Sequence, residues 1–570
     1  MRLHSALRPA ALVALATVVF TATPSFASAQ TAPTAVGGRF TRADTLRGSN
    51  GAGRAWWDVE FYDLRVAVSP RDSSIRGSNA VTYRVLPAET LRRLPRLTEL
   101  QLDLQNPMTL DSATQQGTRL RVRQDGNAWF VTPAAPPRAG ERQTITTHFS
   151  GRPRAARNAP WDGGFVWKSD SLGQPWVATA VQGLGASAWW PNKDTQADEP
   201  DSQRVAITVP DPMVNVSNGR LRRVQHHANG TTTWEWFVTR PINNYDVAVN
   251  AGTYDHFSGV FRGESGPLTL DFWPMAYHRQ AAEQQFRQVP PVLACFESWF
   301  GPFPWYEDGF KLVETPHLGM EHQSAVAYGN RYQNGYLGTD LSGTGLGLLW
   351  DFIIVHEVAH EWWGNSITTK DLADMWVHEA FANYSESLYT ECRMGTAAGA
   401  RYQIGTRSKV TNDKPIIASY GVNDEGSGDM YYKGGNMLHT MRQVVNDDAK
   451  WRSILRGLQS TFRHRTVTGA EVQEYMSAQA GVDLKPVFAQ YLGTNKIPTL
   501  EWRSDSNGVS VRWADVVPGF AMPVRLRWGT AGVRITPTVE WQRVTIPSGA
   551  TGDPRVDENF YVTLRRATNQ

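Results

Sequence analysis

The feature that most constrains this chain of 570 residues is the segment IIVHEVAHEWWG at positions 353–364. It places His356 and His360 four residues apart, with Glu357 directly after the first histidine. On an α-helix, residues four apart project from one face, so the two imidazoles can hold one Zn²⁺ through nitrogen atoms at about 2.0–2.1 Å. Glu357 lies about 100° round the helix, where it can reach a water molecule beside the ion. The pattern predicts a helix that carries two metal ligands and a general base, although a helix that merely contains two histidines remains an alternative at this point.

A third ligand follows within the next predicted helix, MWVHEAFANYSE at 375–386. Glu379 comes after eighteen residues that follow His360, and Gly364 is placed to end the first helix. A short loop and a returning helix would bring Glu379 back beside the histidines. Catalytic zinc sites have three protein ligands and one open position, so the pattern predicts one zinc ion per chain. A helix-surface glutamate is the alternative for Glu379 alone.

Hydrophobic periodicity divides the chain into regions with strand patterns and a region with helical patterns. The chain is too long for one compact core, which predicts several domains. Short alternating runs such as TTTWEWFVT predict a β-rich N-terminal domain over residues 51–256. Helical patterns dominate residues 257–497, which we predict to be the zinc catalytic domain, and strand patterns return over 498–570 as a small β-sandwich domain. The predicted fold class is therefore a multidomain α+β protein.

The N-terminus is typical of a secretory signal peptide over residues 1–29. Arg2 and Arg8 supply a positive end, and the apolar run that follows is too short to span a bilayer as a stable anchor. Ala-Ser-Ala at the end of this range fits a cleavage site after Ala29. We expect a secreted or periplasmic mature protein without a membrane span. Residues 30–50, rich in Thr, Ala, Gly and Ser, predict a flexible lead-in.

The net charge bears on whether the protein binds nucleic acid, and the cysteine content bears on whether it contains a disulfide. The formal net charge of +3 is spread along the chain and no basic run is interleaved with aromatic residues, so we do not expect a nucleic-acid partner. The two cysteines are Cys295 and Cys392. An exported protein could pair them, but the sequence does not say whether their Cα atoms lie close enough, and two separate buried thiols are the alternative. The sequence does not indicate the oligomeric state.

Segments around and beyond the metal pattern resemble the aminopeptidase N family of zinc metallopeptidases, the gluzincin aminopeptidases, which include the leukotriene-hydrolysing aminopeptidases. The spacing from HEVAH to Glu379 is similar to the zinc signature of that family. LGMEHQSAVAYG at 318–329 resembles its peptide-binding Gly-x-Met-Glu-Asn signature, and YYKGG at 431–435 resembles its Tyr-x-Lys-Gly signature. VQGLGASAWWPNKD at 181–194 resembles its N-terminal substrate-side segment. The resemblance covers roughly residues 55 to 500. It implies a saddle-like N-terminal β domain, a thermolysin-like and mainly helical catalytic domain, and a small C-terminal β-sandwich.

The resemblance also implies roles for individual residues. Glu357 would be the general base, and Tyr431 would donate a hydrogen bond to the oxyanion. The zinc ligands would be His356, His360 and Glu379. The implied substrate-binding residues are Glu321, as the anchor of the free amine, with Gly319, Met320 and Gln182. His322 stands where the family has Asn, and some relatives have Glu at the position of Gln182, so fine substrate preference stays open.

The activity that the resemblance implies is a zinc-dependent aminopeptidase acting on peptides with a free N-terminus. One alternative is a hydrolase with the same site that acts as an endopeptidase or on a non-peptide substrate. Another is a non-catalytic binding protein that keeps zinc for folding. Glu357 and Tyr431 argue against the second alternative, because a structural zinc site needs neither and usually has four protein ligands.

Overall fold

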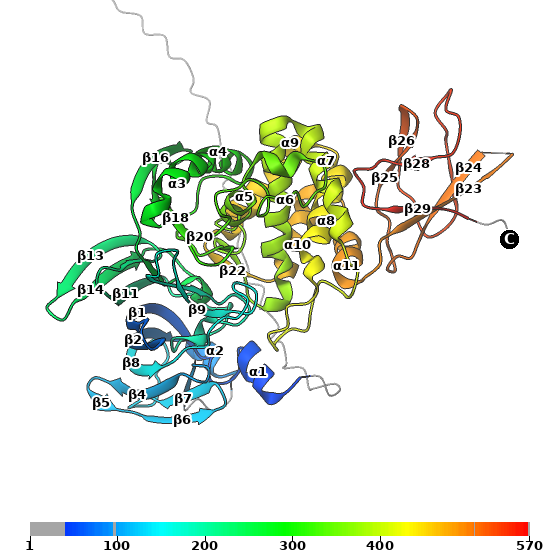
Figure 1. The fold of residues 1–570 in the computed structure, drawn as a ribbon. Coiled ribbons are helices and arrows are strands. Elements are labelled where there is room, and N and C mark those ends of the chain that lie inside the picture. The colour runs from blue at the N-terminus through cyan, green and yellow to red at the C-terminus, as the bar shows by residue number, and fades with distance from the viewer. Residues whose placement is uncertain (1–39, 95–98, 507, 568–570) are drawn as a thin grey trace, which may run out of the picture. The chain divides into compact units, whose positions relative to one another are not determined.

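The computed structural model describes residues 40–94, 99–506 and 508–567, so the signal peptide expected at 1–29 lies outside the described residues. The predicted multidomain α+β class is confirmed (Figure 1). Strands come first along the chain, helices dominate its middle, and strands return at its C-terminal end.

Three sheets form the N-terminal region. The largest has the strand order β13 (Arg220–His227), β14 (Thr231–Val238), β11 (Ser202–Pro210), β1 (Trp57–Ser69), β2 (Ser74–Val85), β8 (Arg142–Gly151), β4 (Thr109–Gln115) and β5 (Thr118–Arg119). A second sheet contains β12 (Val214–Val216), β15 (Asn250–Gly252), β10 (Pro175–Ala180) and β9 (Gly164–Ser169). A third contains β3 (Leu100–Asp103), β7 (Ala128–Thr132) and β6 (Arg121–Asp125).

Side-chain alternation explains why the large sheet has one buried face. Along β1, Tyr62, Leu64 and Val66 are buried, whereas the residues between them are less so. Trp190, in the substrate-side segment predicted from the sequence, packs edge-on against Tyr62 with 5.1 Å between ring centroids. The sheet therefore fixes the position of the loop that carries Gln182.

The middle of the chain begins with a five-stranded sheet and continues as helices. The sheet order is β16 (Phe257–Gly263), β17 (Gly266–Trp273), β18 (Phe310–Glu314), β20 (Val326–Tyr328) and β19 (Gly319–Met320), so β19 is an edge strand. The helices are α3 (Arg279–Gln285), α4 (Val289–Phe300), α5 (Phe352–Ala359), α6 (Trp376–Met394), α7 (Thr396–Gly405), α8 (Tyr432–Val445), α9 (Asp448–Phe462), α10 (Gly469–Ala480) and α11 (Lys485–Gly493). A short ladder joins β21 (Ile367–Thr369) to β22 (Arg465–Val467).

Helix α5 is short, and each of its eight residues is buried. Asp351 caps its N-terminus by accepting hydrogen bonds from the backbone N–H groups of Ile353 and Ile354. The expectation that Gly364 ends this helix is wrong. The helix ends at Ala359, and Gly364 lies in the following turn at φ +116°. His360 at the C-cap keeps right-handed helical dihedrals, so it still projects from the same face as His356.

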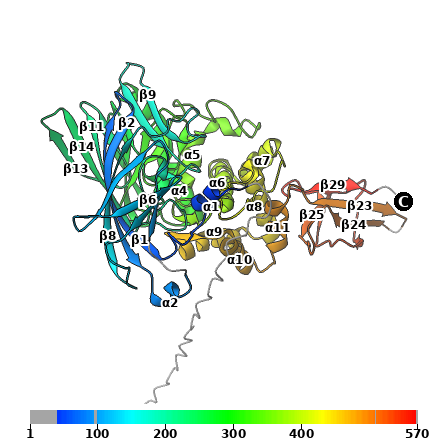
Figure 2. The ribbon, with the colours of Figure 1, turned by 90° about the horizontal axis from the view of Figure 1, so that it is seen from below.

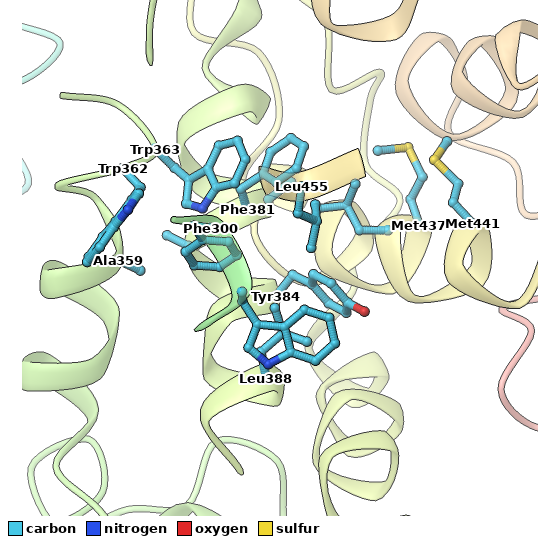
Figure 3. Close-up of a cluster of buried hydrophobic side chains, with 14 of the residues drawn as sticks. Phe300, Ala359, Trp362, Trp363, Phe381, Tyr384, Leu388, Met437, Met441 and Leu455 are labelled. Atoms are coloured by element: carbon cyan, nitrogen blue, oxygen red, sulfur yellow. The ribbon is translucent and has the colours of Figure 1, made fainter. Parts of the chain in front are cut away.

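Aromatic and aliphatic side chains, among them Phe300 of α4, Met437 of α8 and Leu455 of α9, pack against the end of α5 and against α6 (Figure 3). Trp363 stacks on Phe381 of α6 with 4.1 Å between ring centroids. The indole N–H of Trp362 donates to the carbonyl of Gly301, which satisfies a buried polar group. This packing holds the end of α5 against α6, the two helices that carry the predicted metal ligands.

The sequence left the state of the two cysteines open, and the structure pairs them. A disulfide joins Cys295 on α4 to Cys392 on α6, with a Cα–Cα distance of 6.1 Å. It closes a loop with a sequence separation of 97 residues, and that loop contains α5. A cross-link over a loop of this length stabilises the fold mainly by restricting the unfolded chain.

Part of the expected lead-in at 30–50 is ordered. Residues 30–39 lie outside the described part of the chain, but Arg42–Gly48 forms helix α1. Thr41 and Asp44 make a reciprocal capping box at its start. Arg47 near its end donates to the backbone carbonyl of Asp194 at 2.6 Å. The expectation of flexibility is therefore wrong for Arg42–Gly48. The capping box stabilises the start of this helix, and the hydrogen bond from Arg47 to Asp194 holds its end in place.

The dipeptides Asn218-Gly219 and Asn229-Gly230 each predict a hairpin between two strands, and the first of these predictions is wrong. Asn218-Gly219 is a hairpin signal, but β12 and β13 on either side of it belong to different sheets. The buried Asn218 side chain instead donates to the carbonyl of Gln323 at 2.7 Å and ties the N-terminal region to the loop after β19. The second signal, Asn229-Gly230, does connect the paired strands β13 and β14.

The C-terminal strands form two sheets that lie beyond α11 (Figures 1 and 2). One contains β27 (Gln542–Val544), β24 (Gly508–Ala514), β23 (Thr499–Asp505) and β29 (Thr563–Arg566). The other contains β26 (Ala531–Ile535), β25 (Val524–Trp528) and β28 (Arg555–Val556). Among the described residues, no helix combines the length and the apolar character that a membrane crossing requires.

Candidate metal centre and active-site cleft

The three predicted metal ligands converge in the structure. His356 and His360 come from the end of α5, and Glu379 comes from the first turn of α6. Their nearest ligand atoms form a triangle. The two Nε2 atoms are 3.3 Å apart, and Oε2 of Glu379 lies 3.5 Å from Nε2 of His356 and 3.4 Å from Nε2 of His360. All three side chains are buried.

This triangle has the dimensions of a tetrahedral metal site. An ion with bonds of about 2.0–2.1 Å in tetrahedral geometry separates its ligand atoms by about 3.3–3.4 Å. Oε2 of Glu379, the oxygen nearest both histidines, is buried and has no hydrogen-bond partner among the described residues. Two imidazoles and one carboxylate are donors that zinc accepts, so the residues present fit a zinc ion.

Both histidines are oriented by their other ring nitrogen. Nδ1 of His356 lies 2.9 Å from Oε1 of Glu386, and Nδ1 of His360 lies 2.8 Å from the carbonyl oxygen of Trp363. These contacts fix Nε2 as the metal-facing atom. Tyr402 donates to the other oxygen of Glu386 at 2.7 Å, which holds that carboxylate in place.

We expect Glu386→Gln to weaken Zn²⁺ binding by about 10- to 100-fold, because outer partners of ligating histidines contribute on this scale. A glutamine amide cannot accept from both His356 and Tyr402, so one of these two contacts is lost. Competition with a chromophoric chelator measures the affinity. Glu391→Gln on the same helix is the control, because Glu391 pairs with Arg442 away from the metal ligands. Equal affinities of the two variants would contradict the orienting role.

The predicted base lies beside the edge strand of the five-stranded sheet. A Cβ atom added to Gly319 would lie 2.6 Å from Oε1 of Glu357, so a side chain at that position would push the carboxylate aside. Burial raises the pKa of Glu357 to about 7, His356 opposes this rise, and the negative charge of Glu321 adds to it. A carboxylate with a pKa near neutral suits proton transfer in both directions.

The predicted amine anchor is part of the same cluster. Carboxylate oxygens of Glu321 and Glu357 and a ring nitrogen of His360 lie within 4.8 Å of one another. The side-chain amide of Gln182 and the hydroxyl of Tyr245 both donate to Oε1 of Glu321, the latter at 3.1 Å. Two separate segments of the N-terminal region therefore meet at one carboxylate of the middle region.

The metal ligands, Glu357, Glu321 and Gln182 line a cavity of about 400 Å³. Tyr431, at the N-cap of α8, lies with its ring 6.0 Å from the His356 ring between centroids. The structure thus brings together each residue predicted for the site: His356, Glu357, His360, Glu379, Tyr431, Glu321, Gly319, Met320 and Gln182. What each of them does in a reaction stays a prediction at this stage.

Sequence reasoning missed several residues of the site, both in the cavity lining and behind it. Glu386 lies seven residues after Glu379, two helical turns along the same face, so its position was available from the helical period. Tyr245 carries no local signal, because it reaches Glu321 from 76 residues away. Trp161 and Glu425 also line the cavity, and both lie on loops whose course no periodicity predicts.

The geometry defines a class of protein: a mononuclear metallohydrolase-type centre, with two histidines from one helix, a glutamate from the next, and a further carboxylate beside an open cavity. Residues 312–491 match the family described as Peptidase family M1 domain. The matched segment contains His356, Glu357, His360, Glu379 and Tyr431, and it agrees with the resemblance found in the motifs.

Individual relatives are distant in sequence. The chain is 24% identical over 394 residues to Aminopeptidase N of Streptomyces lividans, covering 62% of this chain and 43% of the relative. It is 24% identical over 369 residues to human Aminopeptidase B, covering 61% of this chain and 52% of that protein. The chain thus spans about half the length of the curated relatives it matches. An M1 zinc metallopeptidase from Deinococcus radiodurans shares the fold, with a TM-score of 0.66, 20% identity, and coverage of 79% of this chain and 98% of that one.

Proposed function

We propose that this protein is a zinc-dependent aminopeptidase that removes residues from the free N-terminus of peptides. The observation that carries the proposal is the position of Glu321. Its carboxylate lies within 4.8 Å of a metal-ligand nitrogen and of the predicted base, and it is buried at the wall of the cavity. A buried carboxylate at that place pairs with a substrate ammonium group and disfavours a neutral amide.

The chain's own residues can carry out each proton transfer of peptide hydrolysis. His356, His360 and Glu379 would hold a zinc ion, which would act as a Lewis acid and lower the pKa of a water molecule towards about 7. Glu357 accepts the proton of the attacking water and later donates it to the leaving amine. Tyr431 donates a hydrogen bond to the oxygen that gains negative charge, and such a donor contributes about 10²–10³ in rate. Gly319 and Met320 offer backbone groups at a sheet edge, where they can orient the peptide.

We also propose that the protein is exported and cleaved after Ala29. The sequence pattern at 1–29 supports this. The disulfide between Cys295 and Cys392 supports it independently, because such bonds persist mainly in oxidising compartments such as the periplasm or the extracellular space.

The test uses purified mature protein, with zinc content and the turnover of alanyl and leucyl amide reporters measured before and after chelation. We expect stoichiometric zinc, loss of turnover on chelation, and recovery when zinc is restored. Bound zinc without turnover of free or blocked peptides would favour a non-catalytic or non-peptide role instead.

A further inference from the structure

Helix α1 joins the N-terminal region to a loop of the middle region. At its C-terminal end, a Cβ atom on Gly48 would overlap the backbone of Asn423, so the helix packs directly on that loop. The fully buried Arg54 donates to the backbone carbonyls of Arg47 and Ser49 at 3.0 and 2.9 Å. The end of α1, which carries Arg47, is therefore held from both regions.

Arg47 holds the turn that carries Gln182. Its guanidinium donates to the backbone carbonyl of Leu184 at 3.3 Å and to that of Asp194 at 2.6 Å. The guanidinium also lies 3.3 Å from the carboxylate of Asp194. Gly185 has φ +95°, and a Cβ atom there would overlap the guanidinium, so the side chain of Arg47 lies directly on this glycine. The planar guanidinium thus fixes the end of the turn by several directed contacts at once.

Other contacts hold the same turn at its beginning and middle. The backbone N–H of Gly185 donates to the carbonyl of Val181 at 2.7 Å, which closes the turn. The side-chain amide of Asn423, on the loop beneath α1, donates to the carbonyl of Gly183 at 3.1 Å. Gln182 lies between these anchored positions. Its side chain is therefore presented from a backbone with little freedom.

The turn bears on the amine anchor, because Gln182 donates to Glu321. Tyr245 donates to the same carboxylate oxygen at 3.1 Å. Arg47 and Tyr245 both line one small cavity of about 30 Å³, whereas Gln182 and Glu321 line the active-site cavity. Arg47 thus acts on the anchor through its neighbours and has no contact with a substrate in the active-site cavity.

We propose that Arg47 is a positioning residue for amine binding. It fixes the turn 181–185, and through Gln182 it fixes the direction in which the Glu321 carboxylate points. This inference rests on the proposed function and adds to it a residue outside the active-site cavity that sets the affinity for the substrate ammonium group. A mobile turn would let the carboxylate adopt several orientations, and most of these would pair less well with the ammonium group.

Arg47→Ala should raise KM for leucyl and alanyl amides by about 3- to 30-fold, the scale on which a residue without ligand contact changes binding. kcat should change by less than about threefold and zinc content should stay the same, because Glu357 and the metal ligands are untouched. Arg47→Lys should have an intermediate effect, since lysine keeps the charge but lacks the planar fork. Arg42→Ala is the matched control, because Arg42 lies on the same helix and pairs with Asp125.

A double-mutant cycle separates positioning from a general loss of stability. If Arg47 acts through Gln182, then Arg47→Ala should change KM by less than about twofold in a Gln182→Ala background. Equal effects of Arg47→Ala in the two backgrounds would overturn the inference. A loss of kcat with an unchanged KM would overturn it as well.

Amide hydrogen exchange tests the same step without turnover. The backbone N–H groups of residues 181–185 should exchange at least about threefold faster in Arg47→Ala, and Arg42→Ala should match the unaltered protein. Unchanged exchange of this turn in Arg47→Ala would show that Arg47 does not fix it. If the unaltered protein hydrolyses neither reporter but exchange rises in Arg47→Ala, the proposed function is wrong and the role of Arg47 in fixing the turn stands.

Discussion

Glu357→Gln should lower kcat for leucyl and alanyl amides by about 10²–10⁴-fold while the protein keeps its zinc and its fold. The glutamine has the same shape but cannot accept the proton of the attacking water, and general acid–base catalysis contributes on this scale. The carboxylate is not one of the three converging ligand atoms, so zinc affinity should change little. Stopped or continuous assays give kcat, and elemental analysis gives the zinc content.

Glu474→Gln is a suitable control, because Glu474 is exposed on α10. It should match the unaltered enzyme in rate, zinc content and thermal stability. A Glu357→Gln variant with kcat within about threefold of the unaltered enzyme would remove Glu357 from proton transfer. Loss of zinc in that variant would instead show that the carboxylate supports the metal site.

Glu321→Gln should lower kcat/KM for free-amine peptides by about 10²–10³-fold, because removing one partner of a buried charge pair costs about 2–5 kcal/mol. Glutamine tests the role of the charge more specifically than alanine does, because its carbonyl oxygen can still accept the hydrogen bonds from Gln182 and Tyr245. The wall should therefore keep its shape while losing its charge. Matched peptides with a free and an acetylated N-terminus report the effect.

The acetylated peptide is the internal control, and we expect the unaltered enzyme to cleave it poorly. If the unaltered enzyme cuts the acetylated and free peptides at similar rates, the site belongs to an endopeptidase. If Glu321→Gln retains full activity on the free peptide, another group binds the ammonium. Tyr245→Phe should have a smaller effect on the free peptide than Glu321→Gln, because it removes one hydrogen bond to Glu321 and leaves the negative charge.

The metal triad was predictable because helical geometry is local. The spacing of His356 and His360 sets their common face, and the helical pattern around Glu379 needs only a reversal of the chain to bring it near. The helix ends at Ala359 and not near Gly364 as predicted. The predicted ligand geometry still holds, because His360 keeps helical dihedrals at the helix end. Glu386 could have been found by the same reasoning, extended two turns along α6.

Other parts of the site depend on contacts that no local pattern encodes. Tyr245 and Gln182 reach Glu321 across 76 and 139 residues of sequence. The pairing of Cys295 with Cys392 depends on how α4 packs beside α6, and spacing in the chain says nothing about that distance. Asn218-Gly219 has the local sequence of a hairpin turn. Its conformation is instead set by a distant contact, because the buried Asn218 side chain donates to the carbonyl of Gln323.

Under the proposed function, the edge position of β19 limits which chain ends can be substrates. A chain end that is read through the backbone of an edge strand must itself be extended over its first residues. Helical or tightly folded termini cannot offer their N–H and C=O groups in that way, and a proline near the end has no N–H to offer. Under the proposed function, we therefore expect fragments and frayed chain ends to be shortened, and proteins with well-folded N-termini to stay intact.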